Sequence, residues 1–144
     1  MDFSTTRVFK TKWFARFARR EGIMDATLCE AVERAQKGIV DADLGGNVLK
    51  QRIARPGSGR SGGYRTILLL RIGTRAVFVY GFAKSDRANI DKDELEGFRS
   101  LAAELLNYED ERIEKALDAG ALLEVDCDGD GREDVAQRRA GRDS

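Results

Sequence analysis

Two N-terminal stretches place apolar residues on one side of an α-helix. We predict a helix over Lys12–Glu21, with Thr11 as its cap, and a second over Ala26–Lys37, capped by Asp25. A glycine follows each stretch and ends the helix. Because the connection is short, the two helices form an antiparallel hairpin. The residues predicted to face the core are Trp13, Phe14, Phe17, Ala18, Leu28, Ala31, Val32 and Ala35.

The middle of the chain carries the shorter patterns that are typical of β-strands. Arg7–Lys10 is short and alternating, which indicates an edge strand. Val48–Arg55 alternates apolar and polar residues. Tyr64–Ile72 contains a continuous apolar run, which is typical of a central strand buried on both faces. Arg75–Lys84 follows it, and Leu122–Val125 adds one short strand near the end of the chain.

A tight turn between the two long strands sets their predicted register. Gly73–Thr74 fits a two-residue hairpin turn. The predicted pairs are Ile72 with Arg75, Leu70 with Val77, Leu68 with Val79 and Arg65 with Phe82. The residues predicted to share one face are Arg65, Ile67, Leu69, Phe78, Tyr80, Phe82 and Lys84. Arg65 and Lys84 thereby become diagonal neighbours, roughly 7–8 Å apart at the backbone.

Two further helices and a charged tail follow. Asp91–Glu94 resembles a capping box before a helix whose apolar stripe runs to Leu105, and Glu109–Ala119 predicts a fourth helix. We therefore predict one α+β domain over residues 1–125, a small, mostly antiparallel twisted sheet with two N-terminal helices packed on it and further C-terminal helices. Residues 126–144 are charged, glycine-rich and almost free of apolar residues, which predicts a disordered acidic tail.

The composition narrows the class of protein. A hydrophobic content of 42% argues against global disorder. No apolar run is long enough for a membrane span, and the N-terminus lacks the pattern of a secretory signal. Cys29 and Cys127 are isolated, which we interpret as free thiols of a cytoplasmic protein. The chain has no His, which removes the usual zinc ligand and the usual general base.

The net charge of zero conceals a strong asymmetry along the chain. Residues 1–90 carry 17 Lys and Arg against 8 Asp and Glu, whereas residues 91–144 carry 8 against 17. A basic part joined to an acidic part is expected when one face meets an anionic partner such as nucleic acid. Solvated faces of both signs are the simpler alternative.

The loop Pro56–Gly63 combines glycines with a single cation, Arg60. Glycines let backbone N–H groups approach an anion closely. The loop precedes a strand rather than a helix and lacks the ending of a nucleotide-binding loop, so a flexible connector is the alternative. Arg65 and Lys84, on one face, would hold and polarise a phosphodiester, although most cations at strand ends only extend into water.

Asp126–Gly131 carries the carboxylates of a calcium loop at positions 1, 3 and 5 and the glycine of position 6. Position 12, however, is Gln137 where a bidentate Glu is required, and no amphipathic helix follows. We therefore interpret this segment as part of the acidic tail rather than as a calcium site.

Several motifs, in the same order along the chain, resemble the RelE and HigB toxins of bacterial toxin–antitoxin systems. The motifs are Phe9–Lys12, Asp41–Gly46, Lys50–Arg52, Gly59–Thr66 and Tyr80–Lys84, followed by Asn89 and Ile90. The resemblance covers residues 7–125. Within this family, the chain resembles more specifically the branch of RelE-like translational repressors. The tail beyond Val125 lies outside it.

The resemblance implies a compact sheet with two N-terminal helices packed against it. It also implies an endonuclease that cuts mRNA on the ribosome, needs no metal or cofactor, and is bound by a cognate antitoxin. In such toxins the active surface is a basic concave face of the sheet. Its catalytic cations match Arg65 and Lys84, and Arg60 matches the basic residue before the double glycine.

A mechanism follows as a hypothesis. The 2′-hydroxyl of RNA is the nucleophile, and cations stabilise the charge that develops on the phosphate. We assign charge stabilisation to Arg65 with help from Arg60, and an acid or base-stacking role to Tyr80. Lys84 is the candidate general base, because its cationic neighbours favour its neutral form. The residues expected along the RNA backbone are Lys50, Arg52, Gly62 and Gly63.

Two other functions stay open at this point. Relatives of the ParE type share the fold and inhibit DNA gyrase without cutting RNA, so the fold alone does not fix the chemistry. A non-catalytic nucleic-acid-binding module, such as a repressor subunit, would bind with a strong salt dependence and give no product.

Overall fold

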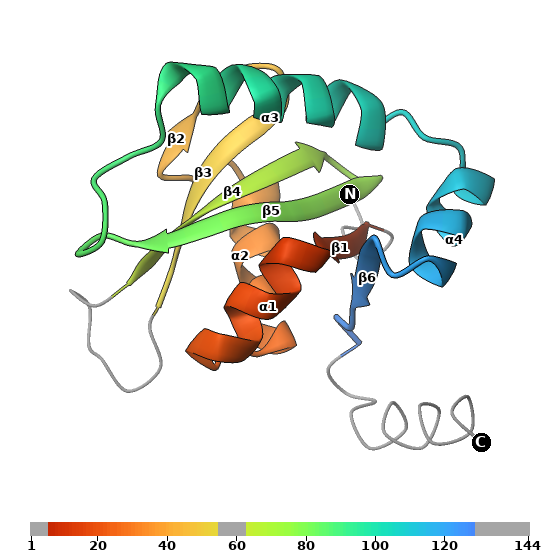
Figure 1. The fold of residues 1–144 in the computed structure, drawn as a ribbon, viewed down its shortest axis with the longest axis horizontal. Coiled ribbons are helices and arrows are strands. Elements are labelled where there is room, and N and C mark those ends of the chain that lie inside the picture. The colour runs from red at the N-terminus through yellow and green to blue at the C-terminus, as the bar shows by residue number, and fades with distance from the viewer. Residues whose placement is uncertain (1–5, 55–62, 129–144) are drawn as a thin grey trace.

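The computed structural model describes residues 6–54 and 63–128, and Figure 1 shows one sheet with helices on both sides. The strands are β1 (Arg7–Thr11), β2 (Ala42–Asp43), β3 (Val48–Ile53), β4 (Tyr64–Arg71), β5 (Arg75–Ala83) and β6 (Leu122–Val125). The helices are α1 (Lys12–Glu21), α2 (Asp25–Gln36), α3 (Lys92–Leu105) and α4 (Asp110–Asp118). The described strands are ordered β2-β3-β4-β5-β1-β6, and among them only β1 and β5 run parallel. The predicted α+β class is confirmed.

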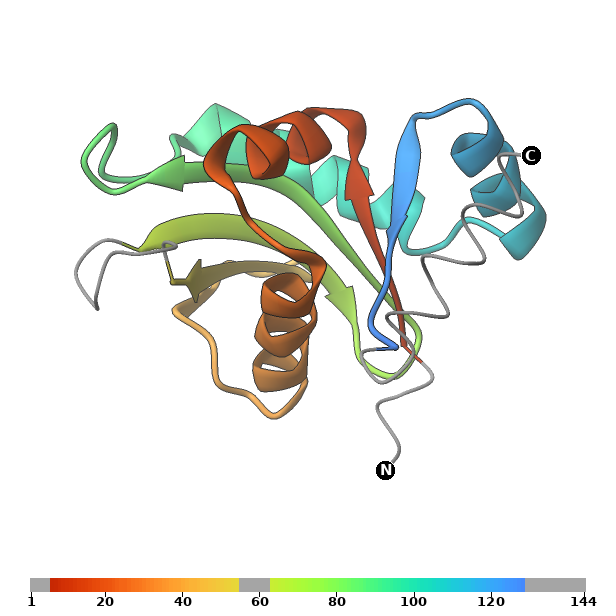
Figure 2. The same ribbon diagram turned by 90° about the horizontal axis from the view of Figure 1, so that it is seen from below.

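The sheet separates two apolar cores. Below it in Figure 1, α1 and α2 pack on one face; above it, α3 crosses the other. Figure 2, viewed from below, shows α1 over β5 and α2 on the side of β3. Helix α4 packs beside β6 and contributes Ile113 to the core on the α3 side. No helix in the described ranges has the length and apolar content of a membrane span.

The ends of α1 form as the sequence predicts. The Thr11 hydroxyl accepts a hydrogen bond from the Phe14 backbone N–H, and Gly22 ends the helix with φ 72°. A left-handed residue at this position is a frequent helix end, and glycine adopts it without a Cβ clash. The predicted inward residues of α1 and α2 are buried, with one exception. Trp13 is 43% exposed, so its predicted place in the core is wrong.

Helix α2 begins differently from the prediction. Its first residue is Asp25 and its cap is Met24, which makes no side-chain capping bond. The Asp25 carboxylate instead pairs with the Lys10 amine at 3.2 Å and accepts a hydrogen bond from the Asp126 backbone N–H at 3.0 Å. This carboxylate therefore connects the start of α2 to β1 and to the residue that follows β6.

Strand β1 does not lie at the edge of the sheet. Its partners are β5 on one side and β6 on the other. Both neighbours come from much later in the sequence, so the local pattern of Arg7–Lys10 contains no sign of them. The edge position predicted for this strand is wrong, and the strand is central because the chain returns twice to pair with it.

The β4–β5 hairpin departs from the predicted register and then returns to it. Arg71 pairs with Arg75, so three residues form the turn instead of two. A β-bulge then leaves Val79 as an extra residue on β5. Because the bulge compensates for the longer turn, Arg65 lies opposite Phe82 as predicted.

The bulge also reverses the side-chain alternation on the first half of β5. Phe78 pairs with Leu68 and packs in the core under α1 and α2. Its predicted place on the face of Ile67 and Tyr80 is therefore wrong. Tyr80, beyond the bulge, lies opposite Ile67 and packs toward α3.

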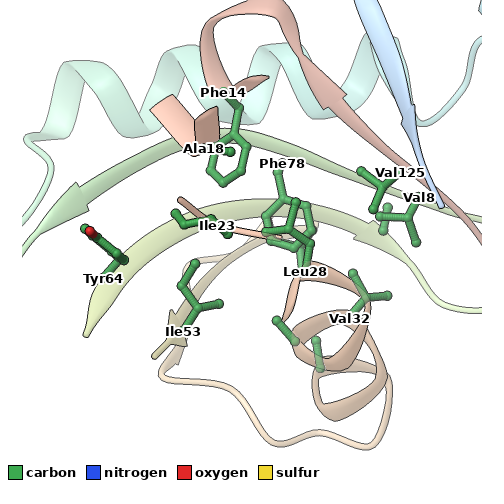
Figure 3. Packing of buried hydrophobic residues seen from close by; sticks show 14 of the residues in the cluster. Val8, Phe14, Ala18, Ile23, Leu28, Val32, Ile53, Tyr64, Phe78 and Val125 are labelled. Atoms are coloured by element: carbon green, nitrogen blue, oxygen red, sulfur yellow. The ribbon is translucent and has the colours of Figure 1, made fainter. Parts of the chain in front are cut away.

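Helix α1 packs closely on β5 beside the last residues of that strand. A Cβ built on Gly81 would lie 2.5 Å from the Phe17 ring, so only glycine allows this contact. The Phe17 ring packs edge-on against Tyr64, which is 1% exposed. Figure 3 shows Phe14 and Phe78 in the same apolar cluster, and the centres of their rings lie 5.2 Å apart.

A disulfide joins Cys29 on α2 to Cys127, with the two Cα atoms 5.4 Å apart. The expectation of free thiols is therefore wrong. The pair escapes sequence reasoning because the cysteines lie 98 positions apart in the sequence, and only the return of β6 beside β1 brings them together. Of the predicted acidic tail the structure describes Asp126–Asp128; residues 129–144, and with them most of the calcium pattern, lie outside the described residues.

Candidate active site

Two rows of side chains cross β3, β4 and β5 on the face that carries α3. One row consists of Arg52, Arg65 and Phe82, which lie directly opposite one another in the ladders. The next row consists of Lys50, Ile67 and Tyr80. Cations that face each other across paired strands repel, so this surface favours an anionic partner.

Asp41, immediately before β2, supplies the counter-charge for two of these cations. Its Oδ2 lies 3.1 Å from the Arg65 Nε and 3.8 Å from the Lys50 Nζ. The Arg65 and Lys50 side chains are only 16% and 17% exposed. Because one carboxylate faces two partly buried cations, this part of the sheet keeps a net positive charge.

Arg87 is a cation of this region that our sequence reasoning missed. Its guanidinium makes two hydrogen bonds to the Glu94 carboxylate, at 2.7 and 3.1 Å, and donates to the Tyr80 hydroxyl at 3.0 Å. It also lies 5.6 Å from the centre of the Phe82 ring. The hydrogen bond to Glu94 raises the pKa of Arg87 and lowers that of Glu94. The only signal in the sequence is the seven-residue spacing to a capping-box glutamate, which does not identify a partner.

An aromatic group surrounds Tyr80 next to these cations. The Trp13 ring lies 4.7 Å from the Tyr80 ring, and the Phe98 and Phe82 rings lie at 5.9 and 6.0 Å. Trp13 is exposed because it covers Tyr80 from α1 instead of entering the core. An exposed ring beside cations is suited to stacking on an unpaired base.

The outer side of α1 adds a second group of positive charges. Its exposed cations are Lys12, Arg16, Arg19 and Arg20. They follow the spacing of one helix stripe, and no acidic residue stands between them. The basic half of the chain thus has a physical location, on α1 and on strands β3 and β4.

Comparison with protein families matches residues 6–125 to the RelE toxin of the RelE/RelB toxin–antitoxin system. The chain belongs to the RelE toxin family. Comparison with curated proteins gives no match. RelE family membership supports the role of a toxin and implies an antitoxin partner.

The residues carried over from the RelE resemblance are placed unevenly. Arg65, Lys50 and Arg52 share the α3-side face of the sheet, and Tyr80 lies on the same face in the row of Lys50. Lys84 follows the end of β5 in a turn and is exposed. No ion pair or hydrogen bond links its amine to residues 6–54 or 63–128, so its pairing with Arg65 stays a prediction.

The glycine loop of the RelE motif is described only at its end. Arg60 and Gly62 lie outside the described residues, so their roles stay predictions. Gly63 has a structural reason to be glycine, because a Cβ there would lie 2.8 Å from the Ile53 carbonyl oxygen. Tyr64 points to the opposite face, where its hydroxyl bonds the Glu21 carboxylate at 2.6 Å.

Proposed function

We propose that this RelE family toxin is an endoribonuclease that cuts mRNA on the ribosome and thereby represses translation. The observation that carries the proposal is the cationic face of β3 and β4, where Arg65, Lys50 and Arg52 lie together near an aromatic group that includes the exposed Trp13 ring. Toxins of this family are generally endoribonucleases. The cytoplasm, where ribosomes and mRNA are found, is the proposed site of action.

The proposed chemistry uses the RNA's own nucleophile and side chains of this chain. The 2′-oxygen attacks the adjacent phosphorus, the bond from phosphorus to the 5′-oxygen breaks, and a cyclic phosphate forms. Lys84 is the base that takes the proton of the 2′-hydroxyl, and an acid such as Tyr80 returns a proton to the leaving oxygen. Arg65, assisted by Arg60, stabilises the charge that develops on the phosphate.

The proposal gives Tyr80 two roles in this site, one for its phenol and one for its ring. Its oxygen accepts a hydrogen bond from Arg87 at 3.0 Å, which fixes the position of the hydroxyl that would donate the proton. Its ring also lies against Trp13, so base stacking is compatible with the same position. Tyr80→Phe separates the two roles, since it keeps the ring and removes the proton.

Arg65→Ala and Lys84→Ala test the proposal. Each is expected to lower cleavage of mRNA on programmed ribosomes by about 100-fold, because each removes a group used in the transition state. Lys115→Ala is the control, since this lysine is exposed on α4 and pairs only with Glu111 among the described residues. Circular dichroism and thermal unfolding confirm the fold of each variant.

Three results would contradict the assigned residues or the endonuclease activity. Full cleavage by both variants would remove the assigned residues from the reaction. Inhibition of gyrase supercoiling by a wild-type protein that leaves mRNA intact would select the ParE-like function, and salt-dependent RNA binding without any product would select a non-catalytic module.

A further inference from the structure

The motif Asp41–Gly46 is part of the RelE resemblance, but the proposed chemistry gives it no role. Its first residue pairs with Arg65, the main candidate for charge stabilisation. The Asp41 carboxylate contacts Arg65 at Nε, on the side of the guanidinium. The two terminal nitrogens of Arg65 make no hydrogen bond within residues 6–54 and 63–128.

The backbone holds Asp41 firmly in this position. Its N–H donates to the Lys50 carbonyl at 3.0 Å, and the next residue, Ala42, pairs with Lys50 in the β2–β3 ladder. The carboxylate therefore approaches Arg65 from a paired strand end rather than from a free loop. Its contact with Lys50 at 3.8 Å supports the same placement.

The rest of the motif fixes this strand end against α3. The Asp43 carboxylate accepts a hydrogen bond from the Gly45 N–H at 3.0 Å and closes the turn. Gly45 and Gly46 have φ of 82° and 63°, and Cβ atoms on them would lie 3.4 and 3.1 Å from the Arg99 side chain. Arg99 in turn donates to the Leu44 carbonyl. The glycines thus allow α3 to hold the turn that carries Asp41.

A guanidinium held at Nε presents its two terminal nitrogens as a fork. Such a fork matches two oxygens of one phosphate, and the geometry is lost when the side chain rotates freely. We propose that Asp41 is a positioning residue that orients Arg65 so that its terminal nitrogens bind the scissile phosphate of RNA. This inference rests on the proposed endoribonuclease function.

The proposal predicts effects of opposite sign on binding and on cleavage. Removing a carboxylate makes the surface more positive, so RNA should bind more tightly at low salt. Freeing Arg65 should slow cleavage, because misplacing a catalytic group by about 1 Å costs up to about 100-fold. A residue that only stabilised the fold would weaken both properties together.

The experiment compares Asp41→Ala, Asp41→Asn and wild type. Asp41→Ala is expected to cleave at least about 10-fold more slowly while binding RNA as tightly as wild type or more tightly. Asp41→Asn keeps a side-chain oxygen at the same position beside the Arg65 Nε and should recover most of the cleavage. Glu33→Ala is the charge-matched control, since Glu33 is exposed on α2, on the opposite side of the sheet. It should change neither property.

Parallel losses of binding and cleavage in Asp41→Ala, or full cleavage in both Asp41 variants, would overturn the proposal.

A readout independent of cleavage is the NMR signal of the Arg65 Nε–H, measured with an RNA oligonucleotide that carries 2′-deoxy sugars and is not cut. The signal should remain protected from exchange in the wild-type complex and become exchangeable in Asp41→Ala. A wild-type protein that shows this signal but cuts no ribosomal mRNA would refute the endonuclease and keep the orienting role of Asp41. Loss of protection when RNA binds the wild type would refute the orienting role itself.

Discussion

At the scale of single residues, Gly81 shows how one missing side chain positions a helix. The Phe17 ring of α1 occupies the space that a Cβ at this position would need. The ring has little freedom to move, because it packs against Trp13, Phe14 and Tyr64. The sequence gives no sign of this contact, since a glycine inside a strand is compatible with several structures.

Gly81→Ala should therefore lower the free energy of unfolding by about 1–3 kcal/mol, the usual cost of overpacking a core. Urea denaturation measures the change. Gly97→Ala is the matched control, because Gly97 lies inside α3 with nothing within 4 Å of a built Cβ. It should raise the free energy of unfolding by about 0.5–1 kcal/mol through helix propensity. An unchanged stability of Gly81→Ala would show that the ring moves freely.

At the scale of secondary structure, the start of α3 depends on charged groups. Asp91 and Glu94 form the predicted capping box, and Glu94 also binds Arg87 through two hydrogen bonds. The box was predictable because both partners lie within four residues. The Arg87 contact was not, because it depends on how the turn after β5 approaches the helix.

The hydrogen bonds to Glu94 predict a pH dependence of stability. They lower the pKa of Glu94 in the folded protein below its ordinary value of about 4.3. A carboxylate with a lowered pKa stabilises the fold above its unfolded pKa, and that contribution is lost as the pH falls through the folded value. Glu94→Gln should therefore be less stable than wild type at pH 7, and the difference should shrink toward pH 3. Denaturant midpoints at both pH values measure it, with the exposed Glu104→Gln as a control that should show no such change.

The β4–β5 hairpin shows both the reach and the limit of sequence reasoning about strands. Alternation and the apolar run predict both strands and the pairing of Arg65 with Phe82. The bulge at Val79 is invisible in the pattern, because one extra residue in an apolar strand changes no residue type. Consequently the face of Arg65 was predictable, but that of Phe78 was not.

At the scale of the whole molecule, the pairing of distant segments escaped prediction. The central place of β1 and the Cys29–Cys127 disulfide both result from the return of β6 to the N-terminal strand. In the candidate site, the cations of β3 and β4 were found because they lie close in sequence to a recognisable loop. Asp41 and Arg87 complete the site from other segments, and no local pattern connects them to Arg65 or Tyr80.

Reduction of the disulfide should destabilise the protein measurably. The bond closes a loop with a sequence separation of 98, for which chain entropy predicts a loss of about 4–5 kcal/mol. Urea denaturation with and without a reductant measures the difference. The reductant should not change the stability of a Cys29→Ser, Cys127→Ser double variant. If the reductant also leaves the stability of the wild-type protein unchanged, the disulfide is contradicted.

The position of β6 affects when the protein becomes complete during its own synthesis. One edge of β1 stays open until the residues of β6 have left the ribosome, because no earlier segment of the described chain pairs with that edge. Domains are made from the N-terminus onward at about 5–20 residues per second. A nascent chain thus spends seconds with an unfinished sheet, and a partner present at that time meets the toxin before its last strand is in place.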